Sequence, residues 1–211
     1  EATAKGICDA GADVVDIGLT GTEEVYFAVT AFNTGAGIEI TASHNPINYN
    51  GMKIVKQGSQ PLTEQEFFNI KKLAEEGNFI QSDRSGLIIN EKTSARDAYV
   101  NRILDFIDLK SLKPLKIVIN SGNGAAGPTI DAIHKKLKEK GVETQFLLVD
   151  HDPDASFPNG IPNPMLEENR SATANAVVRG KADFGVAFDG DFDRCFLFDH
   201  QGNFISGEYM V

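Results

Sequence analysis

The sequence contains few cysteines and no long apolar segment, and both shortages exclude classes of protein. Cys8 and Cys195 stand far apart, in no metal-ligand or redox spacing, and two cysteines cannot form a disulfide scaffold. No apolar run approaches the roughly 18 residues that a membrane-spanning helix needs. The first residues also lack the cationic and then apolar order of a signal peptide. We therefore expect a cytoplasmic protein with two buried free thiols.

Basic residues are also in deficit, which limits the partners. Twenty Lys and Arg residues stand against thirty Asp and Glu residues, so the formal net charge is -10. A chain this acidic repels nucleic-acid phosphates and anionic membranes in the absence of a local basic patch. The lysine cluster at 135–140 is typical of the solvated last turns of a helix. We therefore expect no nucleic acid and no membrane as partner, and the oligomeric state stays open.

The length and composition suit a globular protein of one to two domains. The chain has 211 residues, of which 41% are hydrophobic and 24% charged. Helix-like and strand-like segments alternate throughout, which is typical of an α/β architecture with two open sheets. Residues 93–107 have apolar positions at helical spacing and are expected to bridge two domains, over 1–90 and 91–211. Because helical composition begins at Ala2 without a preceding cap, the first domain is expected to be incomplete at its amino end.

Local signals predict where three helices begin. Thr20 and Glu23 have the spacing of a capping box, in which each side chain bonds the other's backbone amide. Thr63 and Glu66 repeat that spacing. Pro164 is expected in the first turn of a later helix. Strands are expected at 14–17, 37–41, 52–55, 116–120, 144–150, 184–188 and 195–199.

The segment DGDFDR at 189–194 carries three carboxylates at alternate positions. Asp189, Asp191 and Asp193 would repel one another without a cation among them, and hard oxygen ligands suit Mg²⁺. An EF-hand is excluded because Arg194 stands where that calcium loop needs glycine and His200 where it needs glutamate. The flanking strands FGVAF and CFLFD are apolar, so the loop should end a buried sheet, where ligands usually bind. A magnesium site is predicted, with a solvated acidic turn as the alternative.

Two further segments each allow more than one interpretation. In TASHNP at 41–46, Ser43 lacks the G-x-S-x-G elbow of hydrolases, and in an extended chain His44 would point away from it. On residue types alone, this segment is a polar turn capped by Pro46. Residues 122–127, GNGAAG, fit the dinucleotide pattern G-x-G-x-x-G, with Asp150 where a ribose-binding acid belongs. A tight turn between strand and helix is the alternative there.

Four segments taken together resemble the α-D-phosphohexomutase family. They are, in order, GIEITASHNPINYNGMKIV, INSGNGAAGP, FPNGIPNPM and FDGDFDRCFLFD. TASHNP is shared by the whole family, whereas PNGIPNP and DGDFDRC narrow the likeness toward members of mannose-nucleotide biosynthesis. The resemblance covers essentially the whole chain and implies two mixed-sheet α/β domains of the phosphohexomutase type. It also implies that residues 122–127 are a structural turn, which removes the dinucleotide interpretation.

The resemblance implies a phosphoserine enzyme that needs a metal ion. By position in the matching motifs, Ser43 would carry the phosphate. The carboxylates of Asp189, Asp191 and Asp193 would hold one Mg²⁺ ion together with an oxygen on Ser43. The segment 189–194, called the acidic loop below, would repel a phosphate by itself, but it attracts one once a cation bridges the two.

The resemblance also implies the supporting residues and the reaction. His44 and Lys53 would assist proton transfer and phosphate charge, and Arg194 would stand beside the metal loop. The reaction would interconvert mannose 6-phosphate and mannose 1-phosphate, primed by a hexose 1,6-bisphosphate that is also the intermediate. Glucose phosphates, or both sugars, are alternative substrates, because the sugar-reading domains of the family would lie beyond Val211. For the same reason these 211 residues alone are expected to show no useful turnover. An Asp-nucleophile phosphatase is a distant alternative that leaves TASHNP unexplained. A noncatalytic remnant that binds only magnesium or a partner is the other alternative.

Overall fold

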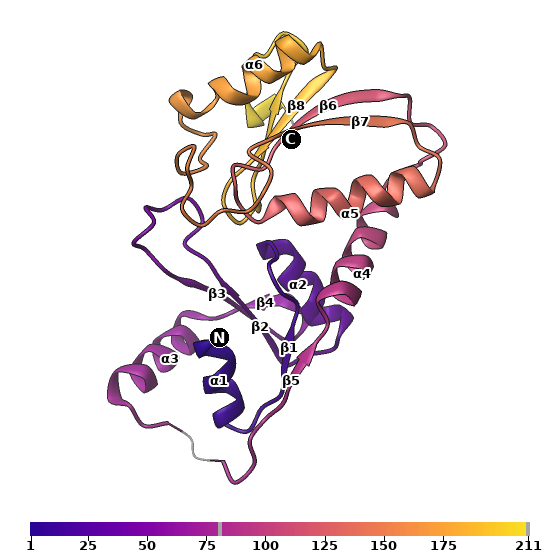
Figure 1. The fold of residues 1–211 in the computed structure, drawn as a ribbon. Coiled ribbons are helices and arrows are strands. Elements are labelled where there is room, and N and C mark those ends of the chain that lie inside the picture. Colours follow the sequence, from indigo (N-terminus) through magenta and orange to yellow (C-terminus); the bar gives the residue numbers. More distant parts are fainter. Residues whose placement is uncertain (80–81, 210–211) are drawn as a thin grey trace.

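A computed structural model of the chain describes residues 1–79 and 82–209. The chain forms two parts that are stacked along the long direction of the molecule, with helix α4 (Lys92–Leu104) running between them (Figure 1). Helices and sheets occur in both parts, so the predicted α/β class is confirmed. Within the described residues, no helix is both long enough and apolar enough to cross a membrane. Residues 80, 81, 210 and 211 of the predicted domain ranges lie outside the described residues.

The first part contains two small sheets, so the described residues form three sheets in place of the two that were expected. Its elements are α1 (Ala2–Asp9), β1 (Val14–Asp16), α2 (Thr22–Ala31), β2 (Ala36–Ile40), β3 (Met52–Lys56), the 3₁₀ turn η1 (Gln57–Ser59), β4 (Gln60–Pro61), α3 (Glu64–Glu76) and β5 (Ile88–Asn90). Strands β1 and β5 pair in parallel, and β2, β3 and β4 form an antiparallel sheet. Strand β5 lies in a stretch that was expected to be a connector, so this strand was not predicted. Its three residues are too few to show the alternating pattern from which a strand is predicted.

The second part is built on one mixed sheet of order β10-β9-β8-β6-β7. After α4 its elements are β6 (Leu115–Asn120), α5 (Ala126–Glu139), β7 (Thr144–Val149), the 3₁₀ turn η2 (Glu167–Asn169), α6 (Ser171–Gly180), β8 (Phe184–Phe188), β9 (Cys195–Phe198), β10 (Phe204–Ile205) and the 3₁₀ turn η3 (Gly207–Tyr209). Strands β7, β6 and β8 are parallel, whereas β9 and β10 are antiparallel to their neighbours. The predicted mixed sheet is therefore present in this part. Of the two thiols expected to be buried, Cys8 on α1 is buried, but Cys195 at the start of β9 is exposed.

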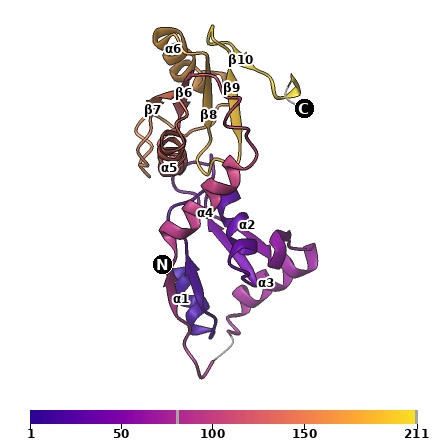
Figure 2. The ribbon, with the colours of Figure 1, turned by 90° about the vertical axis from the view of Figure 1, so that its right-hand side faces the viewer.

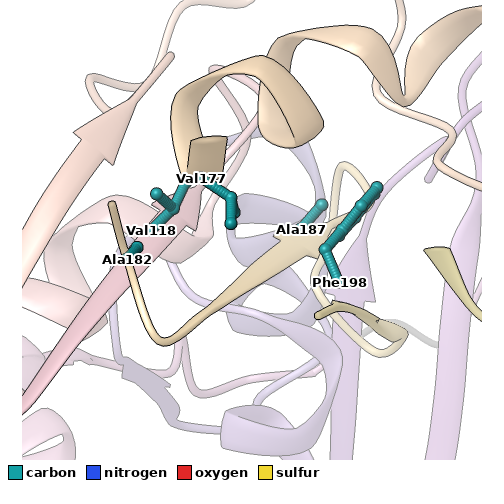
Figure 3. Packing of buried hydrophobic residues seen from close by; sticks show 5 residues of the cluster. All are labelled: Val118, Val177, Ala182, Ala187 and Phe198. Atoms are coloured by element: carbon teal, nitrogen blue, oxygen red, sulfur yellow. The ribbon is translucent and has the colours of Figure 1, made fainter. Parts of the chain in front are cut away.

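Helices α5 and α6 cover opposite faces of the mixed sheet. Successive side chains of a strand point to opposite faces, so neighbouring residues of one strand show which helix covers which face. On β6, Val118 packs with Val177 of α6, and its neighbour Ile119 packs with Ile130 of α5. Figure 3 shows the cluster beneath α6, in which Val118, Val177 and Phe198 are fully buried. Burying one such side chain contributes about 1.5 to 3 kcal/mol, so these clusters hold β6 and β8 in place.

Helix α4 packs against both α2 and α5. Figure 2 shows α5, α4 and α2 following one another from the second part into the first. Val100 and Leu104 of α4 lie in a buried cluster with Leu137 of α5. On the other side, Tyr99 of α4 contacts the ring of Phe27 on α2, with 5.6 Å between the ring centroids.

Of the three predicted helix starts, one is confirmed. Thr63 and Glu66 form the capping box before α3. The capping box expected at Thr20 is absent, because α2 begins after Gly21 and its first amide bonds a distant loop instead. The helix expected at Pro164 is wrong as well. Arg170 donates hydrogen bonds to the carbonyl oxygens of Pro164 and its neighbour, and α6 begins seven residues after the proline.

Candidate active site

Three loops meet at the carboxyl ends of β6 and β8, the edge of an open α/β sheet where ligands bind. The loop between β2 and β3, residues 41–51, extends from the first part toward the second (Figure 1). The loop 189–194 follows β8, and the loop 121–125 follows β6. The first two loops touch through Ser43 and Asp189, and the last two through the hydrogen bond from Ala125 N to Gly190 O (2.9 Å).

Ser43 lies against the acidic loop although 146 positions separate it from Asp189. Its Oγ is 2.9 Å from Asp189 Oδ2 and 3.0 Å from Nδ1 of His44. The expectation that His44 points away from Ser43 was wrong, because Ser43 has a left-handed backbone with φ of 53° and not an extended one. Successive side chains do not alternate in that conformation. The serine hydroxyl therefore contacts both an imidazole and a carboxylate.

The three aspartates of the loop are brought together as predicted. One oxygen from each of Asp189, Asp191 and Asp193 can be chosen so that all lie within 4.8 Å of one another. Asp189 is fully buried and Asp191 is 3% exposed. Among the described residues, Asp191 Oδ1 is buried with no hydrogen-bond partner. Buried carboxylate oxygens without partners are unfavourable, so this donor set fits a hard divalent cation.

Two cations flank the carboxylates. Lys53 Nζ lies 2.7 Å from Oδ2 of both Asp191 and Asp193. Arg194 Nη2 lies 2.5 Å from Asp189 Oδ2, and the same nitrogen contacts His44 Nδ1. Because a guanidinium donates and never accepts, His44 Nδ1 must be an acceptor in this contact. All seven residues that the motifs singled out therefore lie in one cluster.

Sequence reasoning missed two threonines that tie the loops together. Thr41 Oγ1 accepts from Ser43 N (2.8 Å) and donates to Asp191 Oδ2 (3.0 Å). Thr22, the first residue of α2, donates from its amide to the carbonyl of Asp191 (3.2 Å) and from its hydroxyl to the carboxylate (3.3 Å). Lys53 donates to the same hydroxyl at 3.0 Å. Thr41 belongs to TASHNP, but no local signal marks Thr22.

The charges of the site shift several pKa values. Burial acts to raise the pKa of Asp191, but the hydrogen bond and charge of Lys53 outweigh it, and the pKa lies below its usual value. Burial acts to lower the pKa of Lys53, yet the two aspartates beside it raise that pKa. Glu39, the cross-strand partner of Lys53, has its pKa raised to about 7 by burial and by the charge of Asp191. Asp191 and Lys53 are thus ionised at neutral pH.

The glycines of GNGAAG serve close packing, as the structural interpretation predicts. A Cβ on Gly124 would lie 2.6 Å from the carbonyl oxygen of Gly190, and one on Gly127 would lie 2.2 Å from that of His151. The amide of Ala125, just before α5, bonds Gly190. A dinucleotide pyrophosphate needs this amino end of the helix open. The acidic loop fills it, which argues against the dinucleotide alternative.

Gly190→Ala is expected to separate the loop 189–194 from the loop 41–51. A Cβ at this position would lie 2.3 Å from the backbone oxygen of Ser43, which a backbone can relieve only by moving. Overpacking of this kind costs about 1 to 3 kcal/mol of unfolding free energy, measured by urea titration. Gly35→Ala is the matched control, because its Cβ would have no atom within 4 Å. Equal unfolding midpoints for both variants would contradict the close approach.

Comparison with known proteins shows which family the chain resembles. Residues 1–81 and 97–202 match the family models described as "Phosphoglucomutase/phosphomannomutase, alpha/beta/alpha" domain I and domain II. The chain is 51% identical over 211 residues to a phosphomannomutase of Escherichia coli, covering 100% of this chain and 47% of that protein. It is 50% identical over 212 residues to a phosphomannomutase of Vibrio cholerae serotype O1, covering 100% and 45% respectively.

A crystal structure of a phosphoglucomutase/phosphomannomutase family protein from Burkholderia thailandensis superposes with a TM-score of 0.82 at 34% identity. The alignment covers 97% of this chain and 44% of that chain, so our chain spans a little under half the length of the relatives it matches. Because two family models, these relatives and a solved structure all agree across its length, the chain belongs to the α-D-phosphohexomutase family of phosphoglucomutases and phosphomannomutases.

Proposed function

We propose that the chain carries the phosphoryl-carrying and metal-binding parts of a phosphomannomutase, which interconverts mannose 6-phosphate and mannose 1-phosphate. One observation carries the proposal. The hydroxyl of Ser43 lies 2.9 Å from a carboxylate oxygen of Asp189, inside a cluster of three carboxylates and two cations. The names of the relatives at 50% and 51% identity support mannose phosphate as the substrate.

In this proposal Ser43 carries the phosphoryl group. Phosphoserine passes its phosphoryl group to a free hydroxyl of the hexose monophosphate. The bond from Ser43 Oγ to phosphorus breaks, and the proton that the sugar hydroxyl loses ends on Ser43 Oγ. The resulting hexose 1,6-bisphosphate reorients in the site, so that its other phosphate faces Ser43. Ser43 Oγ then attacks the phosphorus at the other end, the bond from phosphorus to the sugar oxygen breaks, and that oxygen takes the proton that Ser43 Oγ gives up. A hexose 1,6-bisphosphate from outside primes the unmodified serine.

The neighbours of Ser43 support each step by charge and placement. A phosphate there carries close to two negative charges, and phosphoryl transfer depends mainly on alignment and electrostatic stabilisation. Arg194 and Lys53 supply fixed positive charge on two sides of the carboxylates. His44 Nδ1 lies 3.0 Å from Ser43 Oγ, so the imidazole stands beside the oxygen that would carry the phosphoryl group. We assign His44, Lys53 and Arg194 as catalytic residues together with Ser43.

The donor set for a metal ion fits Mg²⁺. Asp189, Asp191 and Asp193 would hold the ion together with an oxygen on Ser43. When bound, Mg²⁺ would offset the charge that gathers on the transferring phosphoryl group. The buried, unpartnered Oδ1 of Asp191 is the structural feature that this assignment explains.

We further propose that residues 1–90 and 91–211 are separate domains, each of which supplies one side of the site. Ser43 and Lys53 come from the first range, and the acidic loop comes from the second. An Asp-nucleophile phosphatase is disfavoured, because its nucleophile must meet the incoming phosphate. Asp189 is fully buried beneath Ser43 and Arg194.

The test is a coupled assay on the full-length protein with mannose 6-phosphate, Mg²⁺ and a hexose 1,6-bisphosphate primer, followed by peptide mapping. We expect turnover that depends on the primer, and phosphate on Ser43. Phosphate on another residue, with Ser43 unmodified in active protein, would contradict the assignment. Because the family models name both activities, glucose 6-phosphate is assayed in parallel. A higher kcat/KM for glucose phosphate would make the protein a phosphoglucomutase.

A further inference from the structure

Glu24 is a buried carboxyl group that the proposed mechanism does not use. It lies in the first turn of α2 and is 3% exposed. Its Oε1 accepts a hydrogen bond from the hydroxyl of Thr129 on α5, which is 105 positions away and itself 1% exposed. Arg96 of α4 donates to the same hydroxyl at 3.3 Å. Glu24 therefore joins three helices that come from both parts of the molecule (Figure 2).

A buried carboxyl group is unfavourable unless its surroundings satisfy it. Burial raises the pKa of Glu24, and the hydrogen bond from Thr129 and the charge of Arg96 offset that effect incompletely. Its second oxygen, Oε2, is buried without a hydrogen-bond partner among the described residues. An apolar residue could fill this space without those costs. A glutamate here therefore calls for an explanation other than stability.

Two of these three helices, α2 and α5, hold the acidic loop at their amino ends. At the amino end of α2, Thr22 N donates to the carbonyl of Asp191 (3.2 Å). At the amino end of α5, Ala125 N donates to the carbonyl of Gly190 (2.9 Å). Two adjacent carbonyl groups of the loop are thus held by two different helices. Glu24 is two residues from Thr22. Its hydrogen bond with Thr129 of α5 therefore lies within one helical turn of the contact between Thr22 and Asp191.

We propose that Glu24, through Thr129 and Arg96, is a positioning residue that sets the separation between the amino ends of α2 and α5. This separation in turn shapes the acidic loop 189–194. A change in that separation pulls the carbonyls of Gly190 and Asp191 apart and spreads the three carboxylates. The proposal rests on the proposed function in one respect, since it takes these carboxylates to be the metal ligands.

Two variants of the full-length protein test it, Glu24→Ala and Thr129→Val. The first readout is the dissociation constant for Mn²⁺, added alone and followed by its electron paramagnetic resonance signal. Loss of a residue that orients metal ligands typically weakens affinity by about 10- to 100-fold. We expect about tenfold for Glu24→Ala and a smaller loss for Thr129→Val. Glu24→Gln should restore affinity to within about twofold, because its amide oxygen still accepts from Thr129. The double variant should be no weaker than Glu24→Ala, as residues of one network are not additive.

The second readout needs no metal and no activity. The amides of Thr22 and Ala125 donate to the loop, so their hydrogen exchange reports its placement. Both should exchange faster in Glu24→Ala and Thr129→Val. If wild-type protein binds no Mn²⁺ or has no mutase activity, the proposed function fails, and exchange still decides this inference.

Two controls separate positioning from stability and from charge. Val100→Ala weakens the buried contact between α4 and α5 and should lower the unfolding temperature without changing either readout. Glu23→Ala removes the same charge from the neighbouring exposed position. Wild-type affinity and exchange in Thr129→Val would overturn the proposal, whether or not Glu24→Ala folds. So would an equal effect of Val100→Ala at equal loss of stability.

Discussion

Ser43→Ala is expected to lower mutase turnover by about a thousandfold or more, which corresponds to at least about 4 kcal/mol of activation free energy. The substitution removes the oxygen that, in the proposed mechanism, forms the ester to phosphorus, and no other hydroxyl of the described residues bonds Asp189. The fold should survive. Asp189 keeps its contact with Arg194, so the lost hydrogen bond should cost about 0.5 to 1.5 kcal/mol of unfolding free energy.

The measurement combines the coupled assay, intact mass and thermal unfolding of the full-length protein. Intact mass should show one stable phosphate on the wild type after priming and none on Ser43→Ala. Ser111→Ala is the matched control, because that exposed serine donates to the carbonyl of Asp108 in a surface turn. A folded Ser43→Ala protein with wild-type turnover would remove Ser43 from the mechanism.

Asp191→Asn should weaken Mg²⁺ binding by about 100-fold, or about 2.7 kcal/mol, and should lower turnover with it. Oδ2 of Asp191 already accepts hydrogen bonds from Thr41, Thr22 and Lys53, which leaves Oδ1 for the metal ion. An amide has one oxygen. If that oxygen stays with these donors, an NH₂ group faces the cation. If the amide turns, its NH₂ group faces the ammonium group of Lys53.

Titration calorimetry with Mg²⁺ measures the affinity, and Asp199→Asn is the control for net charge. Asp199 follows β9 at the end opposite the acidic loop. Hydrogen bonds from Asn203 hold the pKa of Asp199 below its usual value, so it carries a full charge at neutral pH. Its loss should leave Mg²⁺ affinity within about twofold. Unchanged affinity in Asp191→Asn would place the metal ion elsewhere.

The local pattern of the sequence was sufficient for most elements and for the chemistry of the acidic loop. The apolar strand FGVAF and the capping box at Thr63 depend on neighbours within four positions, and both are present. The three aspartates likewise cluster by their own spacing, since they occupy alternate positions of one short loop. Interactions between near neighbours in the chain can be predicted from the chain alone.

Tertiary structure decided how the helices start and how the site is assembled. Thr20 has a capping-box spacing, yet α2 begins at Thr22 because the carbonyl of Asp191, which is 169 positions away, satisfies the first amide. His44 turns toward Ser43 because that serine adopts a left-handed backbone where its loop meets Gly190. The place of Glu24 against Thr129 has no local signal either. Each of these features depends on a hydrogen bond or close contact between residues far apart in the chain, and such partners are determined only when the two parts of the molecule pack together.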